Sequence, residues 1–169
     1  MTDYLIVDGY NIINAWPHLK KTSKESLEFS RLELIDNLAE FQGVLWKKII
    51  LVFDAHLNKG SKRHAEQVDD IMVIYTGEGE TADSLIEGLV YELVEEGSVE
   101  VATSDWQEQR VIMGKGAIRL SARDLKNIIT ETKEKMRKNF IEKNDSGKNT
   151  LGNLLDGQIR KKLDNLRHE

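Results

Sequence analysis

Residues 4–14 read YLIVDGYNIIN, and the rest of the chain is interpreted outward from this stretch. Its apolar beginning at 4–7 is the short continuous run that a strand buried on both faces shows. The run ends at Asp8, and Gly9 permits a sharp turn directly after it. In an open α/β sheet, ligands bind at the carboxyl ends of the strands, so a central strand here presents Asp8 to a cleft. The turn lets Asn11 point back toward the same place.

Further acidic residues follow strand-like runs or precede a helical pattern. They are Asp54 after 49–53, Asp105 after 99–104, and Glu80 and Asp83 at the start of a helical pattern. A single strand-terminal acid is more often a turn or helix-capping residue. Because the pattern recurs at several elements, we expect these side chains to share one edge of a parallel sheet.

Strand-like and helix-like patterns alternate along most of the chain. Strands are predicted over 4–7, 49–53, 68–76, 99–103 and, at an edge, 117–120. Apolar side chains at helical spacing predict helices over 26–41, 82–94 and 121–140. This alternation is typical of an α/β fold with a mainly parallel sheet of four or five strands, covered by helices on both faces.

Polar segments between these patterns predict loops and a tail. Pro17 is expected to end a short helical turn, and 19–25 and 55–67 are expected to be exposed loops. Residues 144–152 are rich in Gly, Asn and Ser, which predicts a linker before a last amphipathic helix at 154–166. The predicted organisation is therefore one domain over 1–143 and a linker with a C-terminal helix over 144–169.

Composition restricts the class of protein. The 169 residues are 40% hydrophobic and 31% charged, enough for one globular domain plus a tail. The chain has no cysteine, so a disulfide framework and thiol chemistry are excluded. The start of the sequence lacks the features of a signal peptide, and no apolar run approaches the roughly 20 residues of a membrane span. We therefore expect a cytoplasmic protein that does not contact a membrane.

Charge is distributed unevenly along the chain. Residues 1–110 carry 10 Lys and Arg against 21 Asp and Glu, whereas residues 111–169 carry 14 against 8. An acidic body with a basic C-terminal third is expected when a cation site and a polyanion-binding surface are separate. The alternative is that the basic helices are only solvated faces.

The clustered acids predict a metal site. Several carboxylates at one edge repel one another unless a cation neutralises them. Oxygen ligands without His or Cys suit Mg²⁺ or Mn²⁺, and the four histidines show no paired spacing for zinc. Such ions commonly activate water for phosphodiester hydrolysis. The sequence contains no phosphate-binding glycine loop of the nucleotide-binding type, so no nucleotide cofactor is expected.

An ordered set of motifs supports a family assignment. In chain order they are VDGYN at 7–11, VFDAH at 52–56, ETAD at 80–83, ATSD at 102–105, GKGA at 114–117 and SAR at 121–123. Together they resemble the YacP-like NYN domain proteins over roughly residues 4–125. The resemblance implies a PIN-like three-layer sandwich and a bacterial endoribonuclease that uses Mg²⁺ or Mn²⁺. It also implies action on messenger RNA in association with the ribosome.

The same resemblance implies roles for individual residues. It makes Asp8, Asp83 and Asp105 catalytic metal ligands, with Asn11 as a catalytic residue that orients water or a phosphate oxygen. Asp54 is implied as a further ligand or as a residue that holds the ligands in place. Glu80, beside the site, is the remaining candidate ligand.

A basic surface is expected near these acids, because an RNA backbone approaching carboxylates needs flanking cations to offset repulsion. The candidates are Lys59, Lys62 and Arg63 in the loop after Asp54, and Lys115, Arg119 and Arg123 further along the chain. A solvated charged face is the alternative interpretation of these residues.

Two other functions compete with the nuclease. A receiver-like phosphoacceptor domain would use Asp54, with Ser104 and Lys115 as its hydroxyl and lysine. Receivers usually pair two acids after the first strand, however, whereas Gly9 follows the first acid here. A PIN-like module that binds RNA or the ribosome without cutting is the second alternative, although a pure RNA binder gains nothing from carboxylates near phosphates.

Overall fold

The computed structural model describes residues 1–167, without the side chains of 106, 108, 147–156, 158, 160 and 167. The chain divides into two compact units, Met1–Lys126 and Asn127–Glu169. No helix in the described part of the chain combines the length and the apolar composition needed to cross a membrane.

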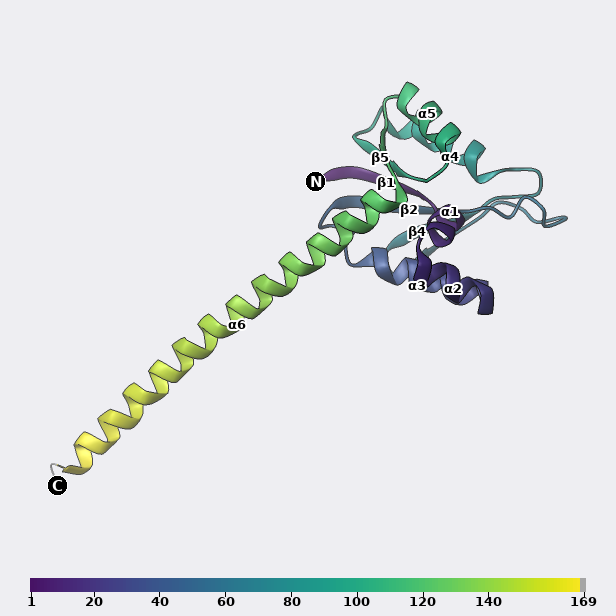
Figure 1. The fold of residues 1–169 in the computed structure, drawn as a ribbon. Coiled ribbons are helices and arrows are strands. Elements are labelled where there is room, and N and C mark those ends of the chain that lie inside the picture. The colour runs from purple at the N-terminus through teal and green to yellow at the C-terminus, as the bar shows by residue number, and fades with distance from the viewer. Residues whose placement is uncertain (168–169) are drawn as a thin grey trace. The chain divides into compact units, whose positions relative to one another are not determined.

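Strands and helices alternate through the first unit (Figure 1). The elements are β1 (Thr2–Asp8), α1 (Gly9–Ala15), α2 (Pro17–Glu25), α3 (Leu27–Ala39), β2 (Trp46–Phe53), β3 (His64–Val68), β4 (Ile71–Tyr75), α4 (Ala82–Leu93), β5 (Val99–Ala102), α5 (Trp106–Gly114), β6 (Ile118–Leu120) and α6 (Ala122–Arg167). The predicted α/β class is confirmed, because helices lie along the chain between the parallel partners β1 and β2, β1 and β5, and β5 and β6.

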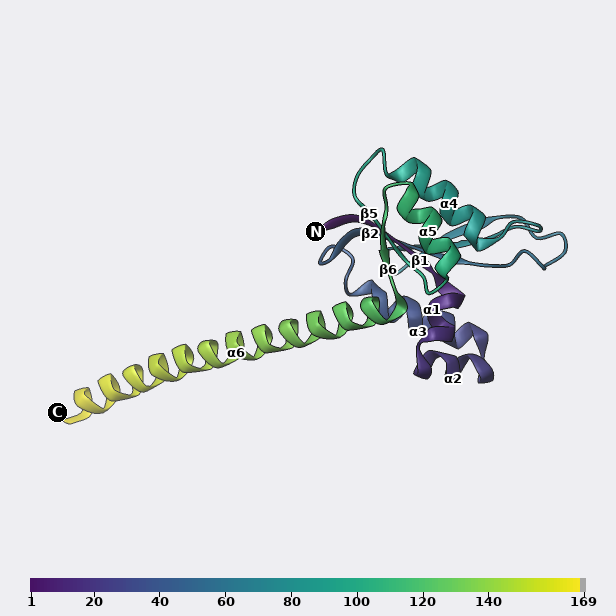
Figure 2. The same ribbon diagram turned by 45° about the horizontal axis from the view of Figure 1, so that its top comes forward.

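The strands form one sheet in the order β3-β4-β2-β1-β5-β6. All neighbouring pairs are parallel except β3 with β4. Figures 1 and 2 show α4 and α5 on one face of the sheet and α1, α2 and α3 on the other, which makes three layers. The strand β1 is central, and Leu5, Ile6 and Val7 are all fully buried. The continuous apolar run therefore predicted its position correctly.

Alternate residues of the central strands supply the two halves of the core. On one face Ile6, Val52 and Ile74 pack in a cluster with Ile86 and Val90 of α4. Successive side chains of a strand point to opposite faces, so the other residues of β1 and β2 face the side on which α1 contacts both strands and α3 contacts β2. Burial on both faces explains why these strands read as continuous apolar runs.

The prediction of four or five strands was wrong, because the described chain has six. The missed strand is β3, of which His64–Gln67 lie in the segment expected to be an exposed loop. Four of its five residues are exposed, so it lacks an apolar alternation and is held by antiparallel pairing with β4. The turn between them, Asp69–Asp70, has φ values of 49° and 68°, which interrupts the single strand expected over 68–76.

The expected loop over 19–25 is also helical. Pro17 stands in the first turn of α2, where its fixed φ favours a helix and its missing N–H costs nothing. Proline therefore starts this helix, and the extended Trp16 before it ends α1 at Ala15, as expected for the short helical turn. Leu19 is the buried residue of α2. A single buried apolar residue produces no helical repeat of apolar positions, so the sequence does not reveal this helix.

The C-terminal segment differs from the prediction as well. A single helix, α6, replaces the predicted linker at 144–152 and separate last helix. A glycine inside a helix costs only about 1 kcal/mol relative to alanine, and no proline follows Pro17 to interrupt it. The domain boundary at residue 143 stays a prediction, and His168 lies outside the described residues.

Candidate active site

Parallel pairing brings three of the predicted acids to the same edge of the sheet. Asp8 ends β1 and is in register with Val52 of β2, two residues before Asp54. On the other side, Val7 is in register with Ala102 of β5, which precedes Asp105. The expectation that these strand exits share the carboxyl edge is therefore confirmed by the sheet topology.

Asp8 is the least exposed of these acids, with 9% of its surface accessible. It stands at the N-cap position of α1, yet its side chain makes no capping hydrogen bond to the described residues of that helix. Gly9 follows because a Cβ there would overlap the ring of Phe53, which packs against the turn. The turn thus keeps a carboxylate at the end of the central strand without using it as a cap.

Asp54 holds neighbouring segments together. Its Oδ2 accepts a hydrogen bond from the backbone N–H of Ala82 at 3.0 Å, and its Oδ1 accepts one from the N–H of His56 at 3.0 Å and contacts His56 Nδ1. Burial alone would raise the pKa of Asp54, but these hydrogen bonds outweigh it, so the pKa lies below its usual value. Asp54 therefore remains a carboxylate and fixes the start of α4.

Asp83 is an exposed residue in the first turn of α4, one position after the anchored Ala82. Thr81 caps the helix by accepting a hydrogen bond from the N–H of Ser84 at 3.2 Å. Asp83 also lines a small pocket of about 230 Å³ together with Gln107 of α5. The anchoring by Asp54 consequently sets the position of Asp83.

The side chains of Asp105 and Asn11 both accept hydrogen bonds from backbone N–H groups in the segment that follows β5. Asp105 Oδ1 accepts a hydrogen bond from the N–H of Gln107 at 2.9 Å. Asp105 therefore caps the start of α5, which is the helix-capping role that a strand-terminal acid more often has. Asn11 Oδ1 accepts a hydrogen bond from the N–H of Ser104, next to Asp105. Asn11 therefore ties α1 to the strand exit that carries Asp105.

Metal ligation stays a prediction. Among the described residues, no group of three or more Asp, Glu or His side chains lies close enough together to hold a metal ion. The donor set at the edge is nevertheless composed of carboxylate oxygens, which fits Mg²⁺ or Mn²⁺. The PIN-like nucleases that the sequence resembles generally use divalent metals, and the chemistry of these donors is compatible with that use.

One predicted ligand and one predicted RNA-binding residue form an ion pair with each other. Arg63 Nε donates to Glu80 Oε1 at 2.9 Å, and Arg63 Nη2 contacts Glu80 Oε2. This hydrogen bonding lowers the pKa of Glu80 below its usual value, and the Gly77 N–H adds to the effect. In this structure the guanidinium of Arg63 therefore contacts the carboxylate of Glu80, the group predicted to bind a metal ion.

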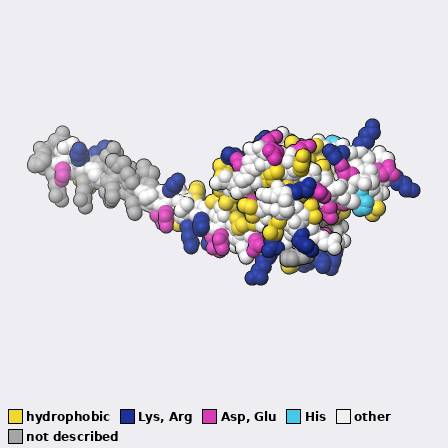
Figure 3. All heavy atoms as spheres, turned by 90° about the horizontal axis from the view of Figure 1, so that it is seen from above, with side chains coloured by type: hydrophobic (Ala, Val, Ile, Leu, Met, Phe, Trp, Pro, Cys, Tyr) yellow, Lys and Arg dark blue, Asp and Glu magenta, His cyan; other side chains and the backbone are white. Residues whose placement is uncertain are grey.

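The other predicted RNA-binding residues lie on several elements. Lys59 and Lys62 are exposed in the loop after β2, and Arg123 is exposed in the first turn of α6. Lys115 lies 3.3 Å from Glu87 and over the ring of Tyr91, and Arg119 donates to Gln109 at 2.9 Å. Figure 3 shows Lys and Arg side chains interspersed with Asp and Glu on the face that it presents.

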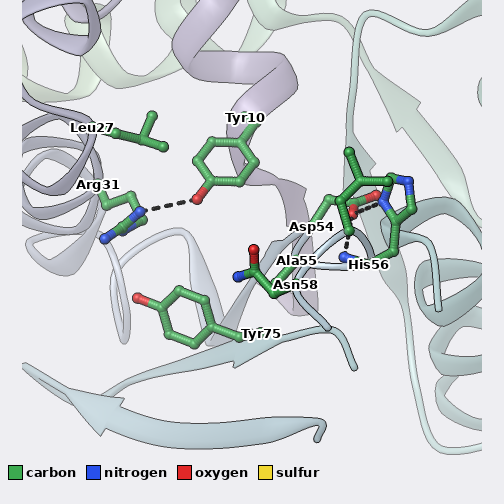
Figure 4. A pocket seen from close by; sticks show the side chains of 9 residues that line it. Tyr10, Leu27, Arg31, Asp54, Ala55, His56, Asn58 and Tyr75 are labelled. Atoms are coloured by element: carbon green, nitrogen blue, oxygen red, sulfur yellow. Dashed lines mark hydrogen bonds and ion pairs between the residues drawn. The ribbon is translucent and has the colours of Figure 1, made fainter. Parts of the chain in front are cut away.

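The sequence interpretation missed a pocket of about 520 Å³ beside Asp54 (Figure 4). Its lining includes Tyr10, Arg31, His56, Asn58 and Tyr75. Arg31 Nη1 donates to the Tyr10 hydroxyl at 3.0 Å. The motifs VDGYN and VFDAH, which contain Tyr10 and residues 54–56 of the lining, were the local signals, whereas Arg31 and Tyr75 come from other elements.

Comparison with known proteins gives the family. Residues 5–168 match the model of the YacP-like NYN domain. The YacP protein of Bacillus subtilis (strain 168) is 47% identical over 124 residues, 73% of this chain and 72% of that protein. The crystal structure of Rae1 (YacP) from Bacillus subtilis has 40% identity and a TM-score of 0.68, covering 99% of this chain and 95% of the other.

A second crystal structure, of a single-substitution mutant of Rae1 (YacP), gives the same identity and TM-score over 80% of this chain and 79% of the other. The sheet with helices on both faces agrees with the PIN/NYN fold. By family model, sequence and structure, the chain belongs to the YacP-like NYN domain family and is homologous to Rae1 (YacP) of Bacillus subtilis.

Proposed function

We propose that this protein is a metal-dependent endoribonuclease that hydrolyses phosphodiester bonds in messenger RNA, in association with the ribosome. The observation that carries the proposal is the shielded Asp8 at the end of the central strand, between the strands that lead to Asp54 and Asp105. Because the chain belongs to a PIN-like nuclease family, we interpret this arrangement of acids as the site of phosphodiester hydrolysis. The partners, messenger RNA and the ribosome, follow from the family resemblance.

The carboxyl edge supplies the residues for such a reaction. Asp8, Asp83 and Asp105 are the proposed ligands of a Mg²⁺ or Mn²⁺ ion, which would supply activated water and charge stabilisation. Asp54 fixes the backbone at Ala82 and thereby positions Asp83. Asn11 holds the loop before Asp105, and its amide nitrogen is the proposed donor to a water or a phosphate oxygen.

RNA binding is proposed to depend most on the cations for which the described part of the chain shows no ion pair. Arg63 and Lys115 are paired with Glu80 and Glu87, which reduces the charge they offer to a phosphate. Lys59 and Lys62 are exposed in the loop that starts at the carboxyl edge. These two lysines are therefore the better candidates for backbone contacts near the site.

The test is RNA cleavage by purified full-length protein, with and without ribosomes, in Mg²⁺, Mn²⁺ or EDTA. Cleavage should require the metal ion and should be lost in Asp8→Asn. The matched control is Asp36→Asn, an exposed acid on α3 away from the strand exits, which should cut like wild type. Binding of RNA or ribosomes without cleavage under all conditions would instead favour the non-catalytic module.

A further inference from the structure

We propose that the pocket beside Asp54 binds one nucleotide of a single-stranded RNA substrate, with the base stacked on the tyrosine rings and the backbone near Arg31. The inference rests on the proposed ribonuclease function and adds a subsite to it. The pocket volume of about 520 Å³ lies within the range of sites for small molecules. Asp54 lines the pocket and also belongs to the carboxyl edge, so a nucleotide here would lie beside the proposed reaction centre.

The two tyrosine rings that line the pocket, Tyr10 and Tyr75, both pack against the buried ring of Phe53. The buried ring of Phe53 lies 5.0 Å from the ring of Tyr10 and 5.6 Å from the ring of Tyr75, measured between centroids. Both tyrosines are only partly buried and line the pocket, and the ring of Tyr75 also stacks against the ring of His64, with 6.3 Å between centroids. Stacking of bases on such fixed aromatic faces is the usual sequence-tolerant way to bind single-stranded nucleic acid.

Arg31 adds a positioned cation beside these two tyrosine rings. Its Nη1 donates to the Tyr10 hydroxyl at 3.0 Å, and its guanidinium carbon lies 5.8 Å from the centre of the Tyr75 ring. The guanidinium is thereby fixed between the two tyrosines (Figure 4). A planar guanidinium suits phosphate recognition and stacking, which are the two contacts that a nucleotide requires.

The polar groups of the pocket complete the match to a nucleotide. The amide of Asn58 lies between Tyr10 and Tyr75 in Figure 4, where it can donate to or accept from a base edge. The Asp54 oxygens are directed at His56 and the Ala82 N–H. Aromatic faces, a fixed cation and an amide together distinguish this pocket from a purely apolar groove.

The experiment measures RNA binding rather than cleavage, so that it can fail independently of the proposed function. A fluorescent single-stranded oligonucleotide is titrated with full-length protein in EDTA, alongside the same oligonucleotide with abasic positions. Wild type should bind the intact RNA more tightly, and Tyr75→Ala should weaken this binding on the order of 10-fold or more. Tyr75→Phe should bind within about twofold of wild type because it keeps the ring.

The abasic RNA separates stacking from general electrostatic attraction. Tyr75→Ala should bind abasic RNA as wild type does, because no base remains to stack. Phe29→Ala is the matched control, since Phe29 is an exposed aromatic on α3 that does not line the pocket. Equal affinity of wild type for intact and abasic RNA would overturn the inference, even if the protein cleaves RNA.

A second variant tests the subsite even if Tyr75→Ala does not fold. Asn58→Trp adds a large side chain at an exposed loop position and should block the pocket without disturbing the sheet. It should lose the preference for intact over abasic RNA while keeping the thermal unfolding midpoint of wild type. Retention of the full preference in Asn58→Trp would contradict the proposed subsite.

Discussion

Asp54 Oδ2 accepts a hydrogen bond from the backbone N–H of Ala82 at 3.0 Å, across a sequence separation of 28 residues. This bond joins the exit of β2 to the start of α4, and thus connects the sheet to the helix that carries Asp83. A carboxylate at a helix start also interacts favourably with the helix dipole. The relationship makes Asp54 a positioning residue and predicts how its variants should behave.

Substitution of Asp54 should reduce stability in a pH-dependent way. Because the folded-state pKa of Asp54 lies below the unfolded pKa, its stabilisation is present above the unfolded pKa and is lost as pH falls through the folded pKa. The free energy of unfolding of Asp54→Asn should therefore be lower than that of wild type at neutral pH. Urea unfolding at neutral pH and in acid should show the difference shrinking; an equal difference under both conditions would contradict this role.

Asp83→Asn should reduce cleavage without loss of stability. Removal of one negative charge from an acidic edge relieves repulsion, which offsets the lost interaction of Asp83 with the start of α4, so the thermal unfolding midpoint without metal should not fall. The rate of RNA cleavage in Mg²⁺ should drop by roughly two orders of magnitude or more, because a metal ion supplies several kcal/mol of stabilisation to the transition state. Cleavage at the wild-type rate would show that Asp83 is not a ligand.

Asp54 should not accept a phosphoryl group. Both of its oxygens are engaged by hydrogen-bond donors, and one of them anchors α4. Incubation with acetyl phosphate and Mg²⁺ should therefore leave the protein mass unchanged. A gain of one phosphoryl mass in wild type, absent from Asp54→Asn, would support the receiver-like alternative.

The ion pair of Arg63 with Glu80 should contribute little to stability. Arg63 is largely exposed, and double-mutant cycles on exposed pairs usually give about 0.2–1 kcal/mol. Arg63→Ala, Glu80→Ala and the double variant should give a coupling energy of this size by urea unfolding. A coupling energy well above that range would mean that the pair holds the loop after β2 in place.

Lys115→Ala combined with Arg123→Ala should weaken binding to RNA or ribosomes and reduce its salt dependence. Removing one cation that touches a phosphate of a single strand should lower the slope of log affinity against log salt by about 0.7. Metal binding should survive, because neither residue is a proposed ligand. Titrations from low to moderate salt decide the outcome, and an unchanged slope and affinity would exclude these residues from the polyanion surface.

Local sequence determined the elements that are buried on at least one face. The continuous apolar run before Asp8 and the apolar positions of α4 at a spacing of 3.6 residues are visible in the sequence itself. The central strand and that helix could therefore be predicted. The parallel sheet then followed from the alternation, and with it the shared edge of the acids. Exposed β3 and α2 bury too little apolar surface to leave such a period, so they could not.

Tertiary structure alone decided which side chains meet. Tyr10, Arg31 and Tyr75 come from α1, α3 and β4, and no local pattern in any of them indicates that they line one pocket. The pairing of Glu80 with Arg63 likewise joins two residues that the sequence assigned to different roles. The physical reason is that periodicity records which face of an element is buried, whereas contacts between elements depend on how the loops return the chain to the sheet.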